Sequence, residues 1–339
     1  MKRALFIGGT GTISSAISKR CVEKGWELYL LNRGNRPLPQ GAKALTVDIG
    51  DESAVLKLIG DMHFDVVADF IVFTVEQLER DIRLFSGRTE QYIFISSASA
   101  YQKPLVNPVI TESTPLVNPY WQYSRNKAAC ETRLLEEFKN TGFPYTVVRP
   151  SHTYDERSVP MPVHGRGGSF QVVERIRQGK KVIVPGDGTS LWTVTHNSDF
   201  AKGFCGLMGN PHAIGNAYHI TSDEHLTWDQ IVTIVARALG VAPHIVHIPS
   251  DVLGALSEDF VGGLIGDKSN TVWFDNSKVK RDAPEFVCTT RFDTGVRQTL
   301  ETIYADKSLQ RPDPAFDAWC DAVIAQYEAA TLALPHYEA

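Results

Sequence analysis

The chain has 339 residues, of which 43% are hydrophobic and 22% are charged. This composition excludes disordered and fibrous classes of protein. The formal net charge of -5 argues against a protein that binds nucleic acid through a dominant positive field. The length suffices for two domains, or for one large domain with an appended lobe.

Cysteine and histidine usage argues against metal centres and disulfide frameworks. The five cysteines are scattered without a CxxC pair, and the ten histidines lack metal-ligand spacing. The apolar run 4–7 is too short for the core of a signal peptide, and no stretch approaches the ~18 apolar residues of a membrane span. We therefore expect a cytoplasmic protein with no metal and no membrane partner.

The first half of the chain alternates short apolar runs with helical patterns, which is typical of β-α-β units and a parallel sheet. It predicts helices at 14–24, 52–60, 75–85 and 120–140. The predicted strands are 4–7, 27–31, 44–47, 66–72, 92–95 and 145–148. Six strands with intervening helices predict a Rossmann-type, doubly wound α/β fold.

The pattern loosens after Arg149-Pro150, and residues 151–190 are rich in Gly, Pro, His and Arg, as binding loops often are. The later elements are predicted as helices at 169–178, 228–239 and 292–304 and strands at 217–221 and 244–248, with a glycine-broken apolar segment at 252–265. A last helix carries Phe316, Trp319, Val323 and Tyr327 at helical spacing.

A glycine-rich turn lies between the first strand and the first helix. Glycines let the backbone approach a pyrophosphate, and the free N–H groups of the helix start bind its charge. This position predicts a dinucleotide site, although a tight turn without a ligand remains the alternative. The predicted contacts are Gly8, Gly9, Thr10, Gly11, Thr12 and Ile13, and Ser14 takes the place of the usual third glycine.

The end of the second predicted strand indicates which dinucleotide is bound. An acid that would hold the ribose hydroxyls of NAD is missing there, and Asn32, Arg33 and Arg36 stand in that region. Two arginines can bind a 2′-phosphate, which favours NADP over NAD; a solvated basic turn is the alternative. Asp48 is placed to bind the adenine amino group and Ile49 to pack on the ring, unless Asp48 only begins the next helix.

A tyrosine and a lysine four residues apart predict the catalytic centre. Tyr123 and Lys127 share one helix face, where the ammonium can lower the pKa of the phenol and hold a nicotinamide ribose. Tyr123 can then exchange a proton with a substrate oxygen while hydride moves to or from the cofactor. The strand at 92–95 delivers Ser97 to the carboxyl edge of the sheet, where ligands of open α/β folds bind.

Together these motifs resemble the extended, or NAD-dependent epimerase/dehydratase, branch of the short-chain dehydrogenases/reductases. The resemblance spans roughly residues 3–305. It rests on the glycine turn, the order Ser97, Tyr123, Lys127, the pair Arg149-Pro150, the GDGT segment 186–189, the H-x-x-D segment 196–199 and the D-x-S-K element 275–278.

The resemblance implies roles for individual positions. Ser97 matches the hydroxyl that bonds the reacting oxygen, Tyr123 the acid/base and Lys127 its ribose-binding partner. The alternatives are that Ser97 only forms a turn at the end of a strand and that Tyr123 and Lys127 are an ordinary pair on a helix surface. The resemblance also implies cofactor contacts from Phe70, Ser96 and Pro150 and a homodimer that uses the helices around 75–86 and 120–140.

The resemblance also implies how the chain divides. We expect a NAD(P)-binding Rossmann domain at 1–150 and a smaller α/β substrate-binding lobe at 151–310, interleaved with it. A C-terminal helix and tail would follow at 311–339.

Two departures bear on the substrate. Trp192 stands where nucleotide-sugar epimerases carry a diphosphate-binding arginine, and the segment 66–74 lacks the usual small residues beside the cofactor. A similar sequence pattern occurs in the chloroplast stem-loop-binding proteins, a branch associated with RNA. The candidate substrate contacts, each of which can equally be an ordinary loop residue, are Ser99, His152, Tyr154, His164, Arg166 and Trp192.

Three functions follow from the sequence. The first is an epimerase, dehydratase or dehydrogenase acting on a sugar-like small molecule, which can be phosphorylated. The second is an NADP-dependent reductase of another small carbonyl compound. The third is a catalytically quiet member that binds RNA or protein, which the acidic balance opposes.

Overall fold

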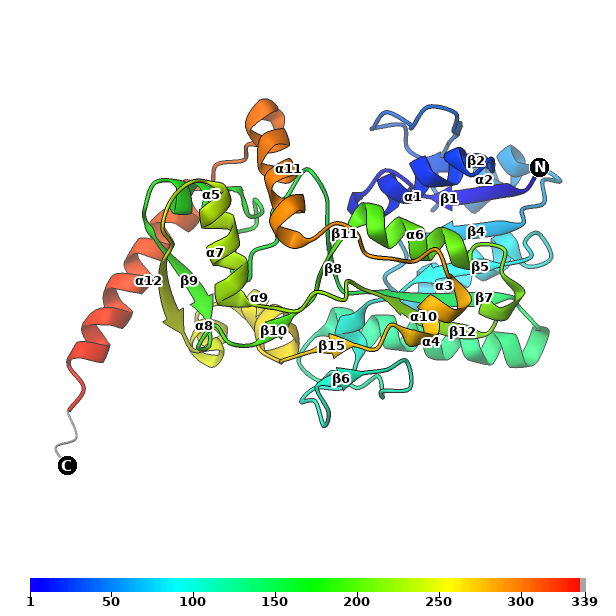
Figure 1. The fold of residues 1–339 in the computed structure, drawn as a ribbon. Helices are drawn as coiled ribbons and strands as arrows, with labels where there is room; N and C mark the ends of the chain where they lie inside the picture. Colours follow the sequence, from blue (N-terminus) through cyan, green and yellow to red (C-terminus); the bar gives the residue numbers. More distant parts are fainter. Residues whose placement is uncertain (336–339) are drawn as a thin grey trace. The chain divides into compact units, whose positions relative to one another are not determined.

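The computed structural model describes residues 1–335 and divides them into two compact units (Figure 1). Unit 1 comprises 1–154, 193–223 and 273–290, and unit 2 comprises 155–192, 224–272 and the rest of the chain from 291. Two later segments belong to unit 1 together with residues 1–154, because their strands and helices complete its sheet and core. The predicted tail 311–339 includes residues 336–339, which lie outside the described part, and its helix belongs to unit 2.

A parallel sheet of seven strands forms the centre of unit 1, in the order β12-β7-β5-β4-β1-β2-β3. This order is that of a Rossmann sheet with a seventh strand at one edge, and it confirms the predicted fold class. The strands are β1 (Arg3–Ile7), β2 (Glu27–Asn32), β3 (Lys43–Thr46), β4 (Val66–Asp69), β5 (Tyr92–Ile95), β7 (Tyr145–Pro150) and β12 (Asn216–Ile220).

Helices cover both faces of this sheet because its strands are apolar on both sides. Ala4 and Phe6 of β1 face one core with α1 (Thr12–Glu23) and α6 (Asn197–Leu207). Leu5 and Ile7 face a second core on the other side. The helices of that side are α2 (Glu52–Ile59), α3 (Val75–Phe85) and α4 (Gln122–Thr141).

Unit 1 also contains several short elements outside its main sheet. β8 (His152–Tyr154) pairs with β11 (Val194–His196), and β6 (Val109–Ile110) pairs with β15 (Trp273–Phe274). The remaining elements are η1 (Ala98–Ala100), η2 (Pro211–Ala213) and α10 (Ser277–Asp282).

Unit 2 is a smaller α/β assembly in which β9 (Lys181–Pro185) pairs with β14 (His244–Ile248) and β10 (Leu191–Trp192) pairs with β13 (Leu226–Thr227). Its helices are α5 (Phe170–Arg177), α7 (Trp228–Ala238), α8 (Ser250–Leu256), α9 (Glu258–Phe260), the π-helix η3 (Val261–Lys268), α11 (Phe292–Ala305), η4 (Lys307–Leu309) and α12 (Pro314–Leu332). None of the helices within residues 1–335 is both long and apolar enough to cross a membrane.

Candidate active site at the carboxyl edge of the unit 1 sheet

The glycine turn after β1 has a backbone that only glycine accommodates. Gly8 and Gly9 have φ angles of 97° and 80°, the left-handed region that L side chains rarely adopt. A Cβ atom on Gly9 would lie 2.6 Å from a methyl carbon of Leu30 in the core. The chain then passes Gly11 and enters α1 at Thr12, so the start of this helix faces whatever binds at the turn.

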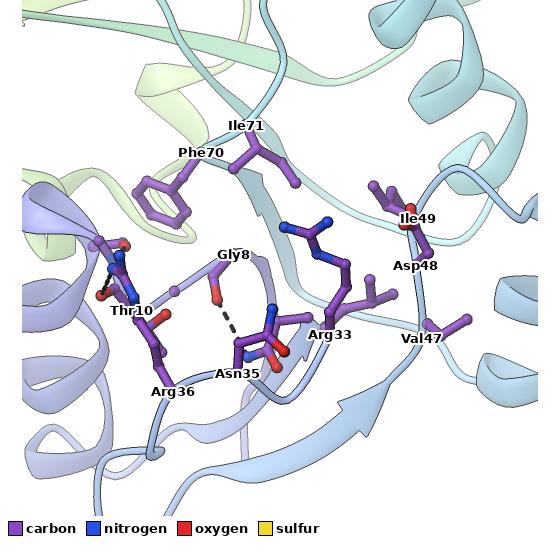
Figure 2. Close-up of a pocket in the computed structure, with 15 residues that line it drawn as sticks. Gly8, Thr10, Arg33, Asn35, Arg36, Val47, Asp48, Ile49, Phe70 and Ile71 are labelled. Carbon is purple, nitrogen blue, oxygen red and sulfur yellow. Dashed lines mark hydrogen bonds between the residues drawn. The ribbon is translucent and has the colours of Figure 1, made fainter. Parts of the chain in front are cut away.

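A cavity of about 600 Å³ opens at this turn (Figure 2). Most of the predicted cofactor residues line it: Gly8, Gly9, Thr10, Gly11, Asn32, Arg33, Arg36, Asp48, Ile49 and Phe70. Five further lining residues were not predicted, namely Ser14, Leu31, Asn35, Val47 and Ile71. Thr12 and Ile13 are outside the lining, where Ile13 packs on the core and the Thr12 carbonyl accepts a hydrogen bond from Asn197.

The charges along the cavity are mostly positive. The Arg36 guanidinium donates to the Thr10 carbonyl at 3.0 Å, and Figure 2 shows the Arg33 guanidinium extending into the cavity. Asp48 is the one carboxylate among the lining residues, and its Oδ1 accepts the Gly50 N–H at 2.9 Å. This end of the cavity therefore suits an anionic group.

The predicted tyrosine and lysine lie together near the start of α4. The Lys127 ammonium is 5.7 Å from the centre of the Tyr123 ring. The Tyr123 ring also packs on Trp121, with ring centroids 5.1 Å apart. Tyr123 is partly exposed, whereas Lys127 is only 2% exposed.

The ammonium of Lys127 is held by main-chain carbonyls. It donates to the carbonyl of Val72 at 2.5 Å and to that of Ile95 at 2.7 Å. Burial lowers the pKa of Lys127 to about 8, against the opposing effect of nearby acidic groups. Sequence reasoning placed Lys127 on the correct helix face but gave no indication of these carbonyl partners.

A chain of hydroxyls links the end of β5 to the start of α4. Ser97 Oγ lies 2.8 Å from Ser99 Oγ, and Ser124 Oγ donates to Ser99 Oγ at 2.7 Å. Asn118 donates to the Ser99 carbonyl at 2.7 Å. Ser97 is the more exposed end of this chain, since Ser99 and Ser124 are buried. Through Ser124, the chain joins Ser97 to the helix turn that carries Tyr123.

A buried ion pair connects α4 to β7 near the same edge of the sheet. Ser96, predicted to contact the cofactor, instead turns its hydroxyl to Glu131 of α4 at 2.5 Å. Arg149 of β7 binds the Glu131 carboxylate with Nη2 at 2.6 Å and donates to the Tyr101 hydroxyl at 3.0 Å. Pro150 follows it as the last residue of β7 and is buried.

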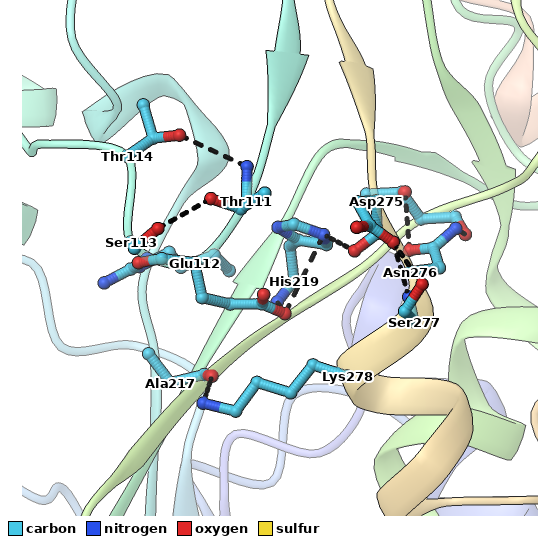
Figure 3. A network of polar contacts seen from close by, with 12 residues as sticks. Thr111, Glu112, Ser113, Thr114, Ala217, His219, Asp275, Asn276, Ser277 and Lys278 are labelled. Atoms are coloured by element: carbon cyan, nitrogen blue, oxygen red, sulfur yellow. Dashed lines mark hydrogen bonds and ion pairs between the residues drawn. The ribbon is translucent and has the colours of Figure 1, made fainter.

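The network continues to a buried histidine on β12. The Tyr101 hydroxyl lies 3.1 Å from Nδ1 of His219, whose Nε2 lies 2.8 Å from the Asp275 carbonyl. Figure 3 shows Glu112 beside this ring, with its carboxylate 3.8 Å from Nε2. Burial lowers the pKa of His219, so the ring is neutral at physiological pH and serves as a structural bridge.

Two buried carboxylates, one at the end of β4 and one on α3, were not predicted. Asp69 and Asp81 are both 0% exposed, and Arg80 pairs with each, at 3.4 Å and 2.7 Å respectively. The Tyr92 hydroxyl donates to Asp81 at 2.6 Å. Burial and the neighbouring Asp81 raise the pKa of Asp69 well above its ordinary value. The two carboxyl groups are far enough apart in sequence that no local motif marks them.

The predicted substrate residues are divided between the units. Besides Ser99, unit 1 contains His152, which is partly exposed, and Tyr154, which is 2% exposed and packs on His196. In unit 2, His164 is exposed, and Arg166 pairs with Asp259 while its side chain is 93% exposed.

Trp192 lies in the interior of unit 2. It is 4% exposed and stacks on Trp228, with centroids 5.7 Å apart. In this position the ring of Trp192, a candidate substrate contact, is a packing element of unit 2.

The later motifs have structural partners. His196 caps α6, with Nδ1 accepting from the Ser198 N–H at 3.3 Å, and Asp199 accepts the N–H groups of Thr289 and Thr290. Lys278 donates to the Ala217 carbonyl at 3.0 Å, as Figure 3 shows. Within residues 1–335, no group of three or more His, Cys, Asp or Glu side chains is arranged to hold a metal ion.

The central part of the chain is similar to a known protein family. The model of the NAD dependent epimerase/dehydratase family matches residues 82–221. The match covers β5, η1, α4 and β7, and therefore Ser97, Tyr123 and Lys127, and it confirms the resemblance expected from the motifs.

Curated relatives represent two groups. The chloroplast stem-loop binding protein of 41 kDa b of Arabidopsis thaliana is 29% identical over 73% of this chain and 66% of its own length. An uncharacterized UDP-glucose epimerase of Bacillus subtilis is 26% identical over 65% and 62%. The chain thus spans just under two thirds of both. UDP-arabinose 4-epimerase 1 of Arabidopsis thaliana is 23% identical over 91% and 80%.

Solved structures agree on the fold. The dTDP-glucose 4,6-dehydratase of Bacillus anthracis matches with a TM-score of 0.72 and 17% identity, covering 92% of this chain and 99% of that one. The UDP-glucose 4-epimerase of Bifidobacterium longum matches with a TM-score of 0.70 and 17% identity, covering 90% and 99%. At such identities the likeness concerns the fold alone.

Proposed function

We propose that the protein is an NAD(P)-dependent oxidoreductase of the epimerase/dehydratase type, acting on a hydroxyl or carbonyl of a sugar or sugar-nucleotide-like substrate. The observation that carries this proposal is the joint occurrence, within unit 1, of a glycine-turn cavity and a Tyr123–Lys127 pair beside a chain of serine hydroxyls. Ligands of open α/β sheets bind at this carboxyl edge.

The residues of this chain have separate tasks in the proposed reaction. Tyr123 takes a proton from, or returns one to, the reacting oxygen of the substrate, and Ser97 donates a hydrogen bond to that oxygen. The ammonium of Lys127 places positive charge next to the phenol. A bound nicotinamide would supply the hydride acceptor. Ser99 and Ser124 hold the Ser97 hydroxyl in position through their hydrogen bonds.

NADP is the favoured cofactor in this proposal. Arg33 and Arg36 line the cavity near the end of β2, and Asn32 uses its Oδ1 to accept the Gly34 N–H. Two guanidinium groups bind a 2′-phosphate better than they bind two ribose hydroxyls. The related dehydratase and epimerase structures are complexes with NAD, so NAD is the alternative.

A sugar nucleotide is the first substrate class to test, because relatives bear the names UDP-glucose epimerase and UDP-arabinose 4-epimerase. The buried Trp192 offers no charge for a diphosphate, whereas the exposed Arg166 is a candidate to bind phosphate. We therefore extend the substrate class to phosphorylated sugars.

The experiment that tests this function compares Tyr123→Phe with Tyr120→Phe. Both changes remove one phenol hydroxyl near the start of α4, and Tyr120 is 41% exposed. Wild-type protein is incubated with NAD or NADP and a panel of UDP-sugars and sugar phosphates, and products are followed by chromatography. We expect Tyr123→Phe to lose about 10²–10⁴-fold in kcat and Tyr120→Phe to keep full turnover. Equal turnover in both variants contradicts the proposal.

Absorbance of the reduced nicotinamide separates the proposed reaction types. Product formed without net change in absorbance identifies an epimerase or dehydratase, because the hydride returns to the substrate within one turnover. A stoichiometric change identifies a dehydrogenase, or the alternative NADP-dependent reductase of another small carbonyl compound.

A second candidate function is a catalytically quiet member that binds RNA. The similarity to the chloroplast stem-loop binding protein favours it, and the net charge of -5 opposes it. A stem-loop RNA titrated into the wild-type protein tests it: binding that Tyr123→Phe leaves unchanged, together with no turnover of any sugar, would favour this second function.

Location and assembly stay predictions. Five free cysteines fit a reducing cytoplasm, and a homodimer through α3 and α4 is expected by resemblance. Sedimentation of the purified protein measures the oligomeric state.

A further inference from the structure

The segment between β4 and α3, residues 70–73, is fixed at both ends. Asp69 Oδ1 accepts the Ile71 N–H at 2.5 Å, and Gln77 Oε1 accepts the Phe73 N–H at 2.6 Å. Gln77 also forms the capping box of α3 with Thr74. A capping box holds the first turn of a helix and the residue before it. The path of this segment is therefore set by side chains of both flanking elements.

This fixed segment surrounds the ammonium of Lys127. The Val72 carbonyl accepts one of its N–H groups. The centre of the Phe73 ring lies 4.7 Å from Nζ, and the centre of the Phe94 ring lies 5.0 Å from it. Both distances are within the range of cation–π contacts.

Phe73 is the outer member of this enclosure. Its side chain is 45% exposed, Phe94 is fully buried, and Lys127 is 2% exposed. The Phe73 ring therefore separates the ammonium from solvent. The centre of the same ring lies 6.3 Å from that of the Tyr123 ring, so Phe73 contacts both members of the Tyr123–Lys127 pair.

We propose that Phe73 is a positioning residue for the Tyr123–Lys127 pair: its ring excludes water from the ammonium and fixes it against the Val72 carbonyl, beside Tyr123. This inference rests on the proposed function for its kinetic consequence. Phe73 acts through Lys127, and its contact with the reacting atoms is not required.

The groups that face the ammonium determine whether loss of the Phe73 ring raises or lowers the pKa of Lys127. Cys130 and Glu131 on α4 and Asp69 on β4 favour its charged form, yet burial outweighs them and lowers the pKa of Lys127 to about 8. β5 contributes Phe94 and the Ile95 carbonyl there, and neither titrates. Removal of the Phe73 ring admits water, which solvates the charged form better than a ring face does, so the pKa of Lys127 rises.

The test uses Phe73→Ala, Phe73→Leu and Phe73→Tyr, with Phe138→Ala as the matched control. Phe138 is also a partly exposed phenylalanine of unit 1, 36% exposed on α4. The first readout is the pH dependence of acetylation of the Lys127 amine in the folded protein. Mass spectrometry of the peptide that contains Lys127 measures the extent of acetylation. The second readout is the basic limb of the pH profile of kcat.

We expect Phe73→Ala to move both midpoints upward by about one pH unit, and Phe73→Leu by less. Phe73→Tyr should restore the wild-type value because it keeps the ring, and Phe138→Ala should leave both midpoints unchanged. Wild-type midpoints in Phe73→Ala, or in Phe73→Leu if the alanine variant does not fold, overturn the inference.

The acetylation readout needs no substrate. If Phe73→Ala moves the acetylation midpoint upward but the wild-type protein turns over no substrate, the proposed function fails and the role of Phe73 in burying Lys127 stands. If turnover occurs and neither midpoint responds to Phe73, the inference fails and the proposed function stands.

Discussion

At the scale of single residues, the carboxyl pair Asp69 and Asp81 determines how β4 ends. Asp69 holds the Ile71 N–H, and Ile71 lines the cofactor cavity. Because burial and Asp81 raise the pKa of Asp69, the folded state favours its protonated form. A raised carboxyl pKa contributes stability below the ordinary pKa of Asp, and this stability is lost as the pH rises through the raised value.

Asp69→Asn tests this charge state. The amide has the shape of the protonated acid and keeps an oxygen to accept the Ile71 N–H. We expect its free energy of unfolding to equal that of the wild type at about pH 3, below the ordinary pKa of Asp, and to exceed it at about pH 8. Urea unfolding at both pH values measures this, and a variant that is less stable at the higher pH would show that Asp69 is ionised in the folded protein.

Breaking the Glu131–Arg149 ion pair is expected to reduce the free energy of unfolding more than breaking a surface ion pair does. Glu131→Ala removes the carboxylate bound to the Arg149 guanidinium and leaves it the Tyr101 hydroxyl and the Glu112 carbonyl. The guanidinium would stay buried, since side-chain exposures of the pair are 8% and 6%. We expect a loss of about 3–5 kcal/mol. Arg83→Ala breaks an exposed pair with Glu52, in which the side chains are 56% and 38% exposed, and should cost at most about 1 kcal/mol. Equal losses in the two variants would refute the distinction.

At the scale of elements, the turn between β1 and α1 combines two constraints in one residue. Gly9 has a positive φ, and a Cβ atom there would meet the Leu30 side chain at 2.6 Å. Gly87 also has a positive φ, of 69°, but a Cβ atom on it would meet nothing within 4 Å. The two glycines therefore separate backbone strain from steric overlap.

Gly9→Ala is expected to destabilise the protein more than Gly87→Ala. The strain of a left-handed alanine costs about 1–2 kcal/mol in both, and overpacking against Leu30 adds about 1–3 kcal/mol for Gly9. Thermal unfolding measures the difference. Dinucleotide binding should weaken in Gly9→Ala alone, and equal effects of both changes on stability and binding would contradict this reading of the turn.

Sequence patterns predicted the regular elements of the sheet and missed elements whose residues serve close packing. The helix α3 and the strands β5 and β14 have the predicted bounds. α6 was missed because it contains Gly203 and Gly206, which lower helix propensity. Cβ atoms there would lie 2.9 Å from Ile220 and 2.5 Å from Ala283, so these glycines allow neighbouring elements to approach.

β4 ends three residues before its predicted end. The apolar run continues through Val72, but Asp69 captures the Ile71 N–H and turns the chain out of the sheet. Local hydrophobicity gives no sign of this turn, because it depends on a side chain stabilised by the distant Arg80.

At the scale of the whole molecule, unit 1 is assembled from three segments of the chain. β12 pairs with β7 along the edge of the sheet, and Phe200 and Phe204 of α6 fill the core beside Phe6. The residues of the site come mostly from the first segment, so their motifs were visible in the sequence. The hydrogen bonds that link Tyr101 to His219 and His219 to Asp275 could not be predicted from the sequence, because they join all three segments.

A chain truncated to residues 1–154 should therefore not fold. It lacks β12 and α6, which exposes the β7 edge and one of the two cores of unit 1. Circular dichroism and gel filtration of the truncated and full chains measure this. A monomeric truncated chain with cooperative unfolding would show that the first segment is a domain by itself.

Calorimetric titration of the wild-type protein with NADP and with NAD is the most direct measurement of the central claim, a dinucleotide at the glycine turn beside Tyr123. We predict that one equivalent of dinucleotide binds, that NADP binds more tightly than NAD, and that Arg33→Ala narrows this difference by weakening NADP alone. The absence of binding heat for both dinucleotides at several temperatures, with the protein shown to be folded, would contradict the account.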